Sequence, residues 1–208
     1  MTGPISFSTM GRLRVRLAQF RQDGRGFGAA EFAMILPLML LLLFGTIEIA
    51  NGVAVDRKVT LLTRTLSDLT SRATLVYPVD VSNFFMIGGA IMQPYPDTPL
   101  KATISEVYID PVTSVGRVQW SEGTAKRALK SPVTVPDGLI SKDSTGKAMP
   151  NQYLIYSEVS YLYVPVVGYV MAKAGITLSD QTFTRPRQST CVFFDPPPST
   201  PNPSCPTS

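Results

Sequence analysis

Few side chains in this sequence are of types that could catalyse a reaction. It contains no histidine, which removes the most common general base and the most common metal ligand. Ser144 and Lys147 match the Ser-x-x-Lys spacing of serine acyl-transferases, but the Ser-Asp-Asn and Lys-Thr-Gly partners of that motif do not occur. No phosphate-binding or dinucleotide-binding glycine motif is present either. We therefore expect a protein that is not an enzyme and that holds no cofactor and no metal.

The two cysteines, Cys191 and Cys205, enclose a proline-rich stretch. Two thiolates alone cannot form a closed zinc site of the common types, whereas two exported cysteines in an oxidising compartment usually pair. The sequence therefore predicts a Cys191–Cys205 disulfide, and the alternative is two free thiols on a disordered tail. Because this stretch follows the last expected strand, reduction of the disulfide should affect the folded body little.

The longest apolar stretch lies near the amino terminus. Sixteen residues between Glu31 and Glu48 carry no charge, and no other stretch of the sequence approaches this length. A helix needs about 20 predominantly apolar residues to cross a bilayer, so we predict one transmembrane helix. The expected organisation is a leader at 1–26, the membrane helix at 27–51, a helical stalk at 52–75, a soluble domain at 76–190 and a proline-rich tail at 191–208.

The net charge of the chain is concentrated in the leader. Five arginines and one aspartate give it +4, the same as the whole chain, so the remainder carries 14 basic and 14 acidic residues. By the positive-inside rule the leader stays in the cytoplasm and the body is exported to the periplasm. The arginines lack the regular aromatic interleaving of nucleic-acid-binding segments, so we expect no nucleic-acid partner. Met10 is an alternative start, because nothing before it is needed for this interpretation.

Glu31 stands at the inner edge of the apolar stretch, where a charge requires a reason. A charged side chain at the centre of a bilayer costs about 3 kcal/mol on insertion scales. If the chain is cut between Gly26 and Phe27, the new amino group lies four residues from Glu31, or about one helical turn. The two charges can then neutralise each other, within one chain or between neighbouring chains. Glu48 lies near the outer end of the span and can reach the interface.

Three fates of this region remain open. The chain is cut after Gly26, or remains whole as an uncut anchor, or is cleaved like a secretory signal peptide near Ala50-Asn51-Gly52, which has a small-x-small pattern. The apolar core is longer than the usual length of about 7–15 residues in signal peptides, and Pro37 interrupts it. We favour the cut after Gly26.

The segment Gly26-Phe27-Gly28-Ala29-Ala30-Glu31-Phe32 resembles the processing site of type IV pilin-like proteins. Residues 28–52 are more similar to the TadE/TadG-like pseudopilins of the tight-adherence (Tad/Flp) pilus, with an acid-Phe-Ala opening, a Leu-Pro step and a second acid. The resemblance implies processing at Gly26, Phe27 and Glu31 by a prepilin peptidase. It also implies assembly in the bacterial inner membrane with other pilin-like subunits and the pilus assembly platform, through Glu31, Phe32, Pro37 and Glu48.

An apolar seam after Gly52 indicates one face of a helix, because its members recur at steps of four and three. They are Val55, Val59, Leu62, Leu66 and Leu69. The seam could pack on the protein's own sheet, which we favour, or face other subunits, and both could hold at different heights. Pro78 is expected to end this helix. Asp80 or Ser82 is then expected to cap a short helix that loosens at Gly88-Gly89.

The rest of the body is rich in β-forming residues. Leu100–Ile109 alternates with a change of parity after Ile104, which either a bulge or a two-sided strand would explain. Arg117–Ser121 is expected to form a hairpin with it. A polar loop at Ser131–Gln152 follows. The remaining expected elements are a strand at Tyr153–Val164, a short helix at Val166–Ala174 and a closing strand at Ile176–Arg185.

Members of the TadE/TadG-like family resemble this body more loosely, at Gly116-x-Val118-x-Trp120, Tyr161-x-Tyr163-x-Pro165 and Arg185-Pro186-Arg187. Their von Willebrand metal-adhesion motif, Asp-x-Ser-x-Ser, does not occur here. We expect an α+β fold in which a long amino-terminal helix packs on a small antiparallel sheet, as in pilins.

The expected function is that of a membrane-anchored pseudopilin, either a minor pilin or an assembly factor. The alternative from a different class is a membrane-anchored periplasmic binding or adhesion module that never joins a filament. An anchored hydrolase that uses Ser144 and Lys147 is a remote third.

Overall fold

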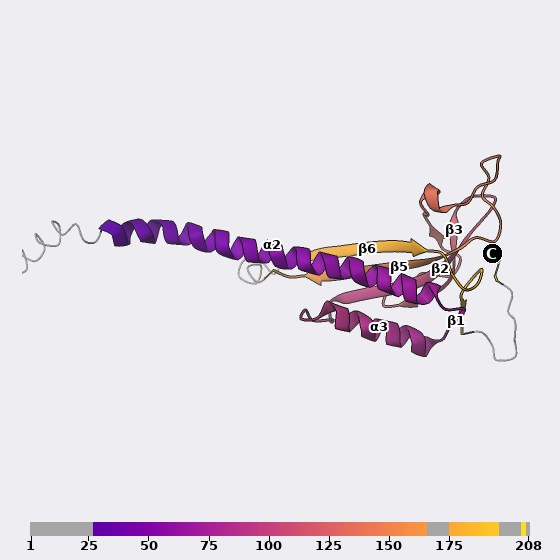
Figure 1. Cartoon of the computed structure of the whole chain (residues 1–208), viewed down its shortest axis with the longest axis horizontal. Coiled ribbons are helices and arrows are strands. Elements are labelled where there is room, and N and C mark those ends of the chain that lie inside the picture. The colour runs from indigo at the N-terminus through magenta and orange to yellow at the C-terminus, as the bar shows by residue number, and fades with distance from the viewer. Residues whose placement is uncertain (1–26, 166–174, 196–204, 207–208) are drawn as a thin grey trace, which may run out of the picture. The chain divides into compact units, whose positions relative to one another are not determined.

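The computed structural model of the chain describes residues 27–165, 175–195 and 205–206 (Figure 1). The chain forms two compact units, Met1–Ile47 and Glu48–Ser208. Helix α2 (Phe27–Ser71) begins in the first unit and ends in the second. The leader at 1–26 and the short helix expected over Val166–Ala174 lie outside the described residues.

The described part of the first unit is the apolar beginning of α2. Its side chains are exposed around the whole helix, as in Met34 (83% exposed) and Leu41 (68%). A helix that is apolar on every face and is not packed against protein is suited to lipid, and α2 is long and apolar enough to cross a membrane. Pro37 lies inside the helix without ending it. This helix fits a single-pass membrane anchor.

The second unit is built on a five-stranded antiparallel sheet with the strand order β4-β3-β2-β5-β6. The strands are β2 (Leu100–Ile109), β3 (Gly116–Gly123), β4 (Pro132–Val133), β5 (Tyr153–Tyr163) and β6 (Ile176–Thr184). The central strand β2 pairs with β5 from Leu100 opposite Tyr161 to Tyr108 opposite Tyr153. The long strands confirm the sequence prediction, and so does the α+β arrangement.

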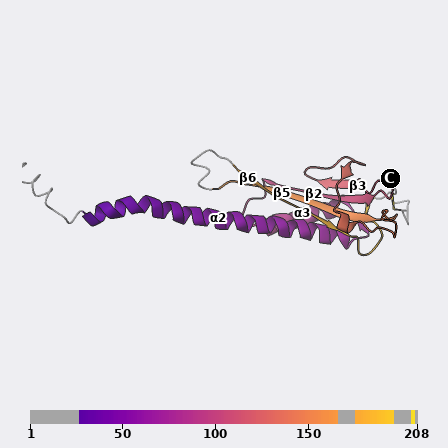
Figure 2. The same ribbon diagram turned by 90° about the horizontal axis from the view of Figure 1, so that it is seen from above.

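The second-unit part of α2 packs on one face of this sheet (Figure 2). Leu62 and Leu66 are fully buried against Ile104, Ile155 and Val159 of the sheet. Helix α3 (Pro78–Met92) contributes Val81 and Met92 to the same core. The core therefore lies between the two helices and the sheet.

A β-bulge between Glu106 and Val107 switches the faces of β2, as the change of parity predicted. Before the bulge, Ala102 and Ile104 belong to the core beneath α2. After the bulge, Val107 and Ile109 belong to a second apolar cluster. One extra residue in a strand has this effect because side chains alternate between the faces with a period of two.

The stretch 131–152, expected as a polar loop, covers that second cluster. It contains β4 and the 3-10 helix η2 (Asp137–Leu139), and it buries Val133, Val135 and Ile140. Its many prolines and glycines indicate a loop, and its apolar residues are spaced too irregularly to indicate a strand or a helix. The loop prediction was incomplete for this reason.

Pro78 begins a helix instead of ending one. Helix α2 ends at Ser71, the short strand β1 (Leu75–Val76) follows, and Pro78 is the first residue of α3. Proline is suited to that position because the first amides of a helix have no intrahelical acceptor. Asp80 caps the helix as expected, although from its third position and not from before it: its carboxylate accepts a hydrogen bond from the Tyr77 amide at 2.9 Å, as in a capping box.

Gly88 lies within α3 and not at its end. A Cβ at this position would lie 3.1 Å from Cδ1 of the buried Leu62. The glycine therefore allows α3 to approach α2 closely, which is why a residue that usually weakens a helix is found in its interior.

The stretch 191–208 is more than a tail after the last strand. Strand β7 (Phe193–Phe194) lies within it and pairs in parallel with β1, with Leu75 opposite Phe193. The neighbouring Cys191 and Val192 are fully buried. A two-residue strand has no readable periodicity, and its partner is remote in the sequence, so this element could not be predicted.

Candidate functional site

The residues predicted to be processed lie at the start of α2. Gly26 is outside the described residues, Phe27 is the first residue of the helix, and Glu31 follows with an exposed side chain. Positions i and i+4 of a helix are neighbours on one face. An amino group created at Phe27 would therefore lie on the side of the helix that carries Glu31. It would also stand at the positive end of the helix dipole, where a carboxylate is favourable.

Phe32 and Pro37, predicted to act in assembly, belong to the same exposed segment. Phe32 is 58% exposed. Pro37 removes one backbone donor from the helix, and the helix nevertheless continues to Ser71. The structure thus brings Glu31, Phe32 and Pro37 together along the beginning of one helix.

Glu48 lies further along α2 and is the first residue of the second unit. The hydroxyl of Tyr163 donates a hydrogen bond to its Oε2 atom at 2.9 Å. Burial and this hydrogen bond raise the pKa of Tyr163 to about 12. The Tyr163 ring also lies 3.8 Å from the position that a Cβ would take at Gly52. The sequence suggested an acid reaching the interface, and the structure adds a contact with the body that the Tyr-x-Tyr-x-Pro motif could have indicated.

The apolar seam of the stalk is used by the protein's own core. Val55, Val59, Leu62 and Leu66 are at most 1% exposed, which confirms the first of the two expected roles. The seam is therefore closed to other subunits at these positions. Val53 and Leu61 remain half exposed on the same helix.

The loosely shared motifs of the body each hold elements together. A Cβ at Gly116 would lie 2.6 Å from Cγ1 of Val107 and 2.9 Å from the carbonyl oxygen of Val133, so only glycine fits. Arg187 forms an ion pair with Asp68 of α2 at 2.8 Å, and its amide donates to the Ser71 carbonyl at 2.8 Å. These contacts give the motifs a structural role.

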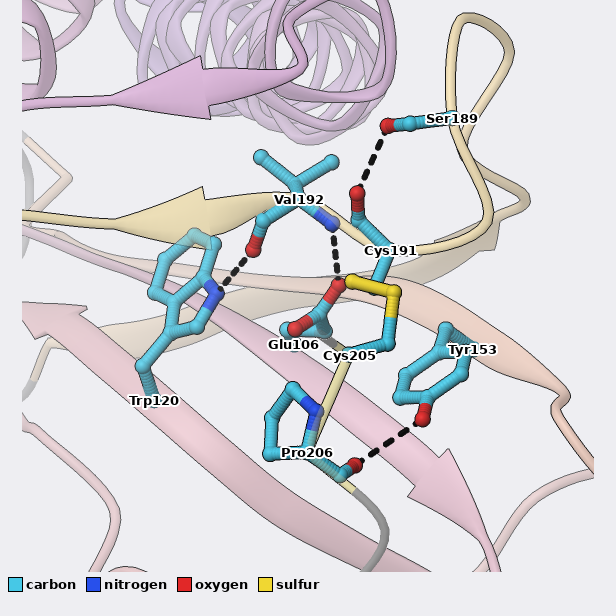
Figure 3. The surroundings of a disulfide bond; sticks show 8 residues. All are labelled: Glu106, Trp120, Tyr153, Ser189, Cys191, Val192, Cys205 and Pro206. Carbon is cyan, nitrogen blue, oxygen red and sulfur yellow. Dashed lines mark hydrogen bonds between the residues drawn. A yellow bond between two sulfur atoms is a disulfide. The ribbon is translucent and has the colours of Figure 1, made fainter. Parts of the chain in front are cut away.

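The two cysteines form the predicted disulfide, with their Cα atoms 5.8 Å apart (Figure 3). Cys191 is fully buried with Tyr108 and Tyr153, and Cys205 packs against this cluster. Next to Cys205, the carbonyl of Pro206 accepts a hydrogen bond from the Tyr153 hydroxyl at 2.9 Å. The disulfide is thus part of the folded body.

Glu106 is a buried acid that sequence reasoning missed. It is 1% exposed, and its Oε1 atom accepts a hydrogen bond from the Val192 amide at 2.6 Å. Its Oε2 atom is buried without a hydrogen-bond partner. Burial raises the pKa of Glu106 to about 8, although the Val192 amide and Trp120 oppose this shift. The sequence signal that could have indicated this buried acid is its position in β2, next to the point where the apolar residues change parity.

Ser144 and Lys147 lie in an exposed turn and not at a helix start. The turn is closed by Asp143, whose Oδ1 atom accepts hydrogen bonds from the Thr145 amide at 2.8 Å and the Lys147 amide at 3.0 Å. The Thr145 hydroxyl donates to the same Oδ1 atom at 2.6 Å, and this hydrogen bond, followed by those from the amides, lowers the pKa of Asp143. Asp143 therefore explains this stretch as a structural turn. Among the described residues there is no group of three or more acidic or cysteine side chains placed to hold a metal.

A polar groove of about 590 Å³ lies over β2, β5 and β6. Arg127 lines it and donates two hydrogen bonds to the carboxylate of Glu158, at 2.6 and 2.7 Å. The Arg127 guanidinium also lies 5.3 Å from the centre of the Tyr156 ring. This pairing raises the pKa of Arg127 above its usual value. Arg127 and Glu158 are paired with each other, and Lys101 and Asp180 also line the groove, so it offers a polar surface that carries charges of both signs.

Comparison with known proteins places part of the chain beside a described family. The model of a family described as TadE-like protein matches residues 26–65, which cover the expected processing site, the apolar helix and the beginning of the stalk. No curated protein and no solved structure matched the chain.

Proposed function

Since the chain is TadE-like over residues 26–65, we propose that it is a pseudopilin of a tight-adherence pilus, a minor pilin or an assembly factor that a prepilin peptidase processes after Gly26. One observation carries the proposal. The match begins at Gly26, and Glu31 and Phe32 then stand exposed at the beginning of an apolar helix that is long enough to cross a membrane.

Processing gives Glu31 its role. The cut creates an amino group at Phe27, and an ammonium in lipid needs a counter-charge, because an isolated charge there costs several kcal/mol. Glu31 supplies that charge from the same chain, or from a neighbouring chain, since its side chain is exposed. Neutralisation between chains would favour association of subunits within the membrane.

The proposed orientation places the leader in the cytoplasm and the second unit in the periplasm, with the helix in the inner membrane. The arginines of the leader support it through the positive-inside rule. The disulfide also supports it, because disulfides persist in oxidising compartments.

Association would use residues 27–47 of α2. The large apolar side chains of α2 that precede Glu48 in the sequence are exposed, whereas Val55, Val59, Leu62 and Leu66 are buried in the protein's own core. The partners are therefore other pilin-like subunits and the assembly platform, met within the bilayer.

The second candidate is a membrane-anchored binding or adhesion module that stays outside a filament. The polar groove that contains Arg127 and Glu158 favours it, because it is the kind of surface that a polar ligand could occupy. In that case function would lie in the second unit alone.

Replacement of Glu31 separates the two functions. Glu31→Ala should still be cut before Phe27, because the peptidase acts on the residues at the cut, but it should no longer co-purify with other pilin-like subunits from membranes. The control is Lys101→Ala in the polar groove, which should leave co-purification unchanged. If Glu31→Ala recovers the same subunits and supports normal pilus output, the assembly role is wrong and the binding module is favoured.

A further inference from the structure

The backbone of Val192 is bound on both sides by side chains of the sheet (Figure 3). Its amide donates to Oε1 of Glu106 on β2 at 2.6 Å, and its carbonyl accepts from Nε1 of Trp120 on β3 at 2.7 Å. Two side chains from neighbouring strands thus satisfy both polar groups of one residue. Without them, both groups would be buried and unpaired, since Val192 is fully buried.

Val192 is the central attachment of the carboxyl-terminal segment, residues 191–195 with 205–206. On one side of it lies the buried Cys191 of the disulfide. On the other side, the Phe193 amide donates to the Thr74 carbonyl at 3.1 Å, and the Phe194 ring stacks on Trp120 at 5.3 Å. The segment closes the end of the core between β1 and the sheet, so loss of its hold on Val192 would loosen this closure.

The surroundings of Glu106 suit a neutral carboxyl and not a carboxylate. Its second oxygen, Oε2, is buried and has no donor. In the described residues no ion pair includes Glu106 and no charged group contributes to its shift, while the phenol of Tyr153 on β5 interacts with it electrostatically. A buried charge without a partner costs several kcal/mol, whereas a neutral carboxyl that accepts one hydrogen bond costs far less.

We propose that Glu106 and Trp120 form a proton-dependent latch for the carboxyl-terminal segment. The neutral carboxyl of Glu106 holds the Val192 amide, and loss of its proton to water charges the buried site and releases the segment. The latch does not depend on the role proposed for α2.

The direction of the pH effect follows from the raised pKa of Glu106. The pKa of Glu106 is about 8 in the closed state, against 4.5 for the exposed carboxyl. The closed state therefore binds a proton that the open state loses, so closure is strongest below 4.5 and weakens as the pH rises to about 8. Burial raises the pKa of Tyr153 to about 12, so its phenol stays neutral throughout this range.

Hydrogen exchange tests the latch in the full-length, disulfide-bonded protein in detergent micelles. Protection of the Val192, Phe193 and Asp195 amides, which donate to Glu106, Thr74 and Val76, should fall by up to about tenfold per pH unit between pH 5 and 8 after correction for the intrinsic rate at each pH. Amides of the β2–β5 ladder are the internal reference and should change little. Constant protection of the Val192, Phe193 and Asp195 amides over this range would overturn the proposal.

Two variants test separately the hydrogen bond of Glu106 to the Val192 amide and that of Trp120 to the Val192 carbonyl. Glu106→Gln keeps the acceptor for the Val192 amide and cannot ionise, so its protection should not depend on pH. Trp120→Phe keeps the aromatic ring and loses the Nε1 donor, so protection should fall by the same factor at every pH. A Gln variant that loses protection with pH as the natural protein does, or a Phe variant with unchanged protection, contradicts the latch.

A measurement on the natural protein covers the case in which Glu106→Gln does not fold. The ¹³C chemical shift of the Glu106 carboxyl should titrate with a midpoint well above 4.5, in the same pH range in which protection is lost. A midpoint near 4.5 overturns the proposal.

Discussion

The hydroxyl of Tyr163, at the end of β5, donates a hydrogen bond of 2.9 Å to Oε2 of Glu48 on α2. The contact joins the last residue of the sheet's longest strand to the helix at the first residue of the second unit. Two features of the sequence, the second acid of the apolar helix and the Tyr-x-Tyr-x-Pro motif, therefore meet in one interaction. It fixes where α2 begins to pack on the body.

The first prediction concerns this pair. Tyr163→Phe and Glu48→Ala should each lower the free energy of unfolding of the second unit, and a double-mutant cycle should give a coupling energy of about 1 kcal/mol. Trp120, the single tryptophan of the chain, reports unfolding in denaturant by its fluorescence. Glu48→Gln, which keeps an oxygen acceptor, is the matched control. Additive effects of the two substitutions would show that the hydrogen bond contributes nothing.

The second prediction concerns the disulfide. The exported protein should be two hydrogens lighter than its dithiol form in non-reducing mass spectrometry. Cys205→Ala should lower the free energy of unfolding by up to about 3 kcal/mol, the chain-entropy value for a loop of about 15 residues. Cys191→Ala should lower it further, because Cys191 is fully buried and its loss leaves a cavity.

This expectation differs from the one drawn from the sequence, in which reduction affects the body little. Cys191 packs with Tyr108 and Tyr153, and Cys205 lies next to the carbonyl that Tyr153 binds. If Cys205→Ala leaves the free energy of unfolding unchanged, the disulfide does not stabilise the folded body, and the expectation from the sequence is correct.

The third prediction concerns Gly116. Gly116→Ala places a methyl group 2.6 Å from a side chain and 2.9 Å from a backbone oxygen, so it should lower the free energy of unfolding by about 1–3 kcal/mol. The control is Gly138→Ala, because nothing lies within 4 Å of a Cβ at that position. Equal stabilities in thermal unfolding would mean that β3 and β4 shift to accept the methyl group.

Elements with a regular pattern could be predicted from the sequence. The apolar stretch after Glu31 predicted α2, the seam at Val55 and Leu62 predicted how that helix packs, and the change of parity in β2 predicted the bulge after Glu106. In each case neighbouring residues carry the signal, because helix and strand periods determine which side chains share a face.

Contacts between distant residues could not be predicted in this way. Pro78 is equally consistent with the end of one helix and the start of another. In the structure it starts α3, and the short strand β1 before it pairs with β7, which is remote in the sequence. The burial of Glu106 depends on Val192, which approaches from the far end of the chain. Such partners leave no periodic trace in the sequence.

The central claim is that the chain is processed as a pseudopilin, and the amino terminus of the membrane-extracted protein tests it most directly. With active prepilin peptidase, amino-terminal sequencing should read Phe27 first, and Gly26→Leu should leave the full-length chain. Gly45→Leu is the matched control, because Gly45 also lies in α2, away from the cut and with nothing within 4 Å of a Cβ, so this variant should be cut normally. An amino terminus at Val53, or an uncut chain in the presence of the active peptidase, would contradict the account.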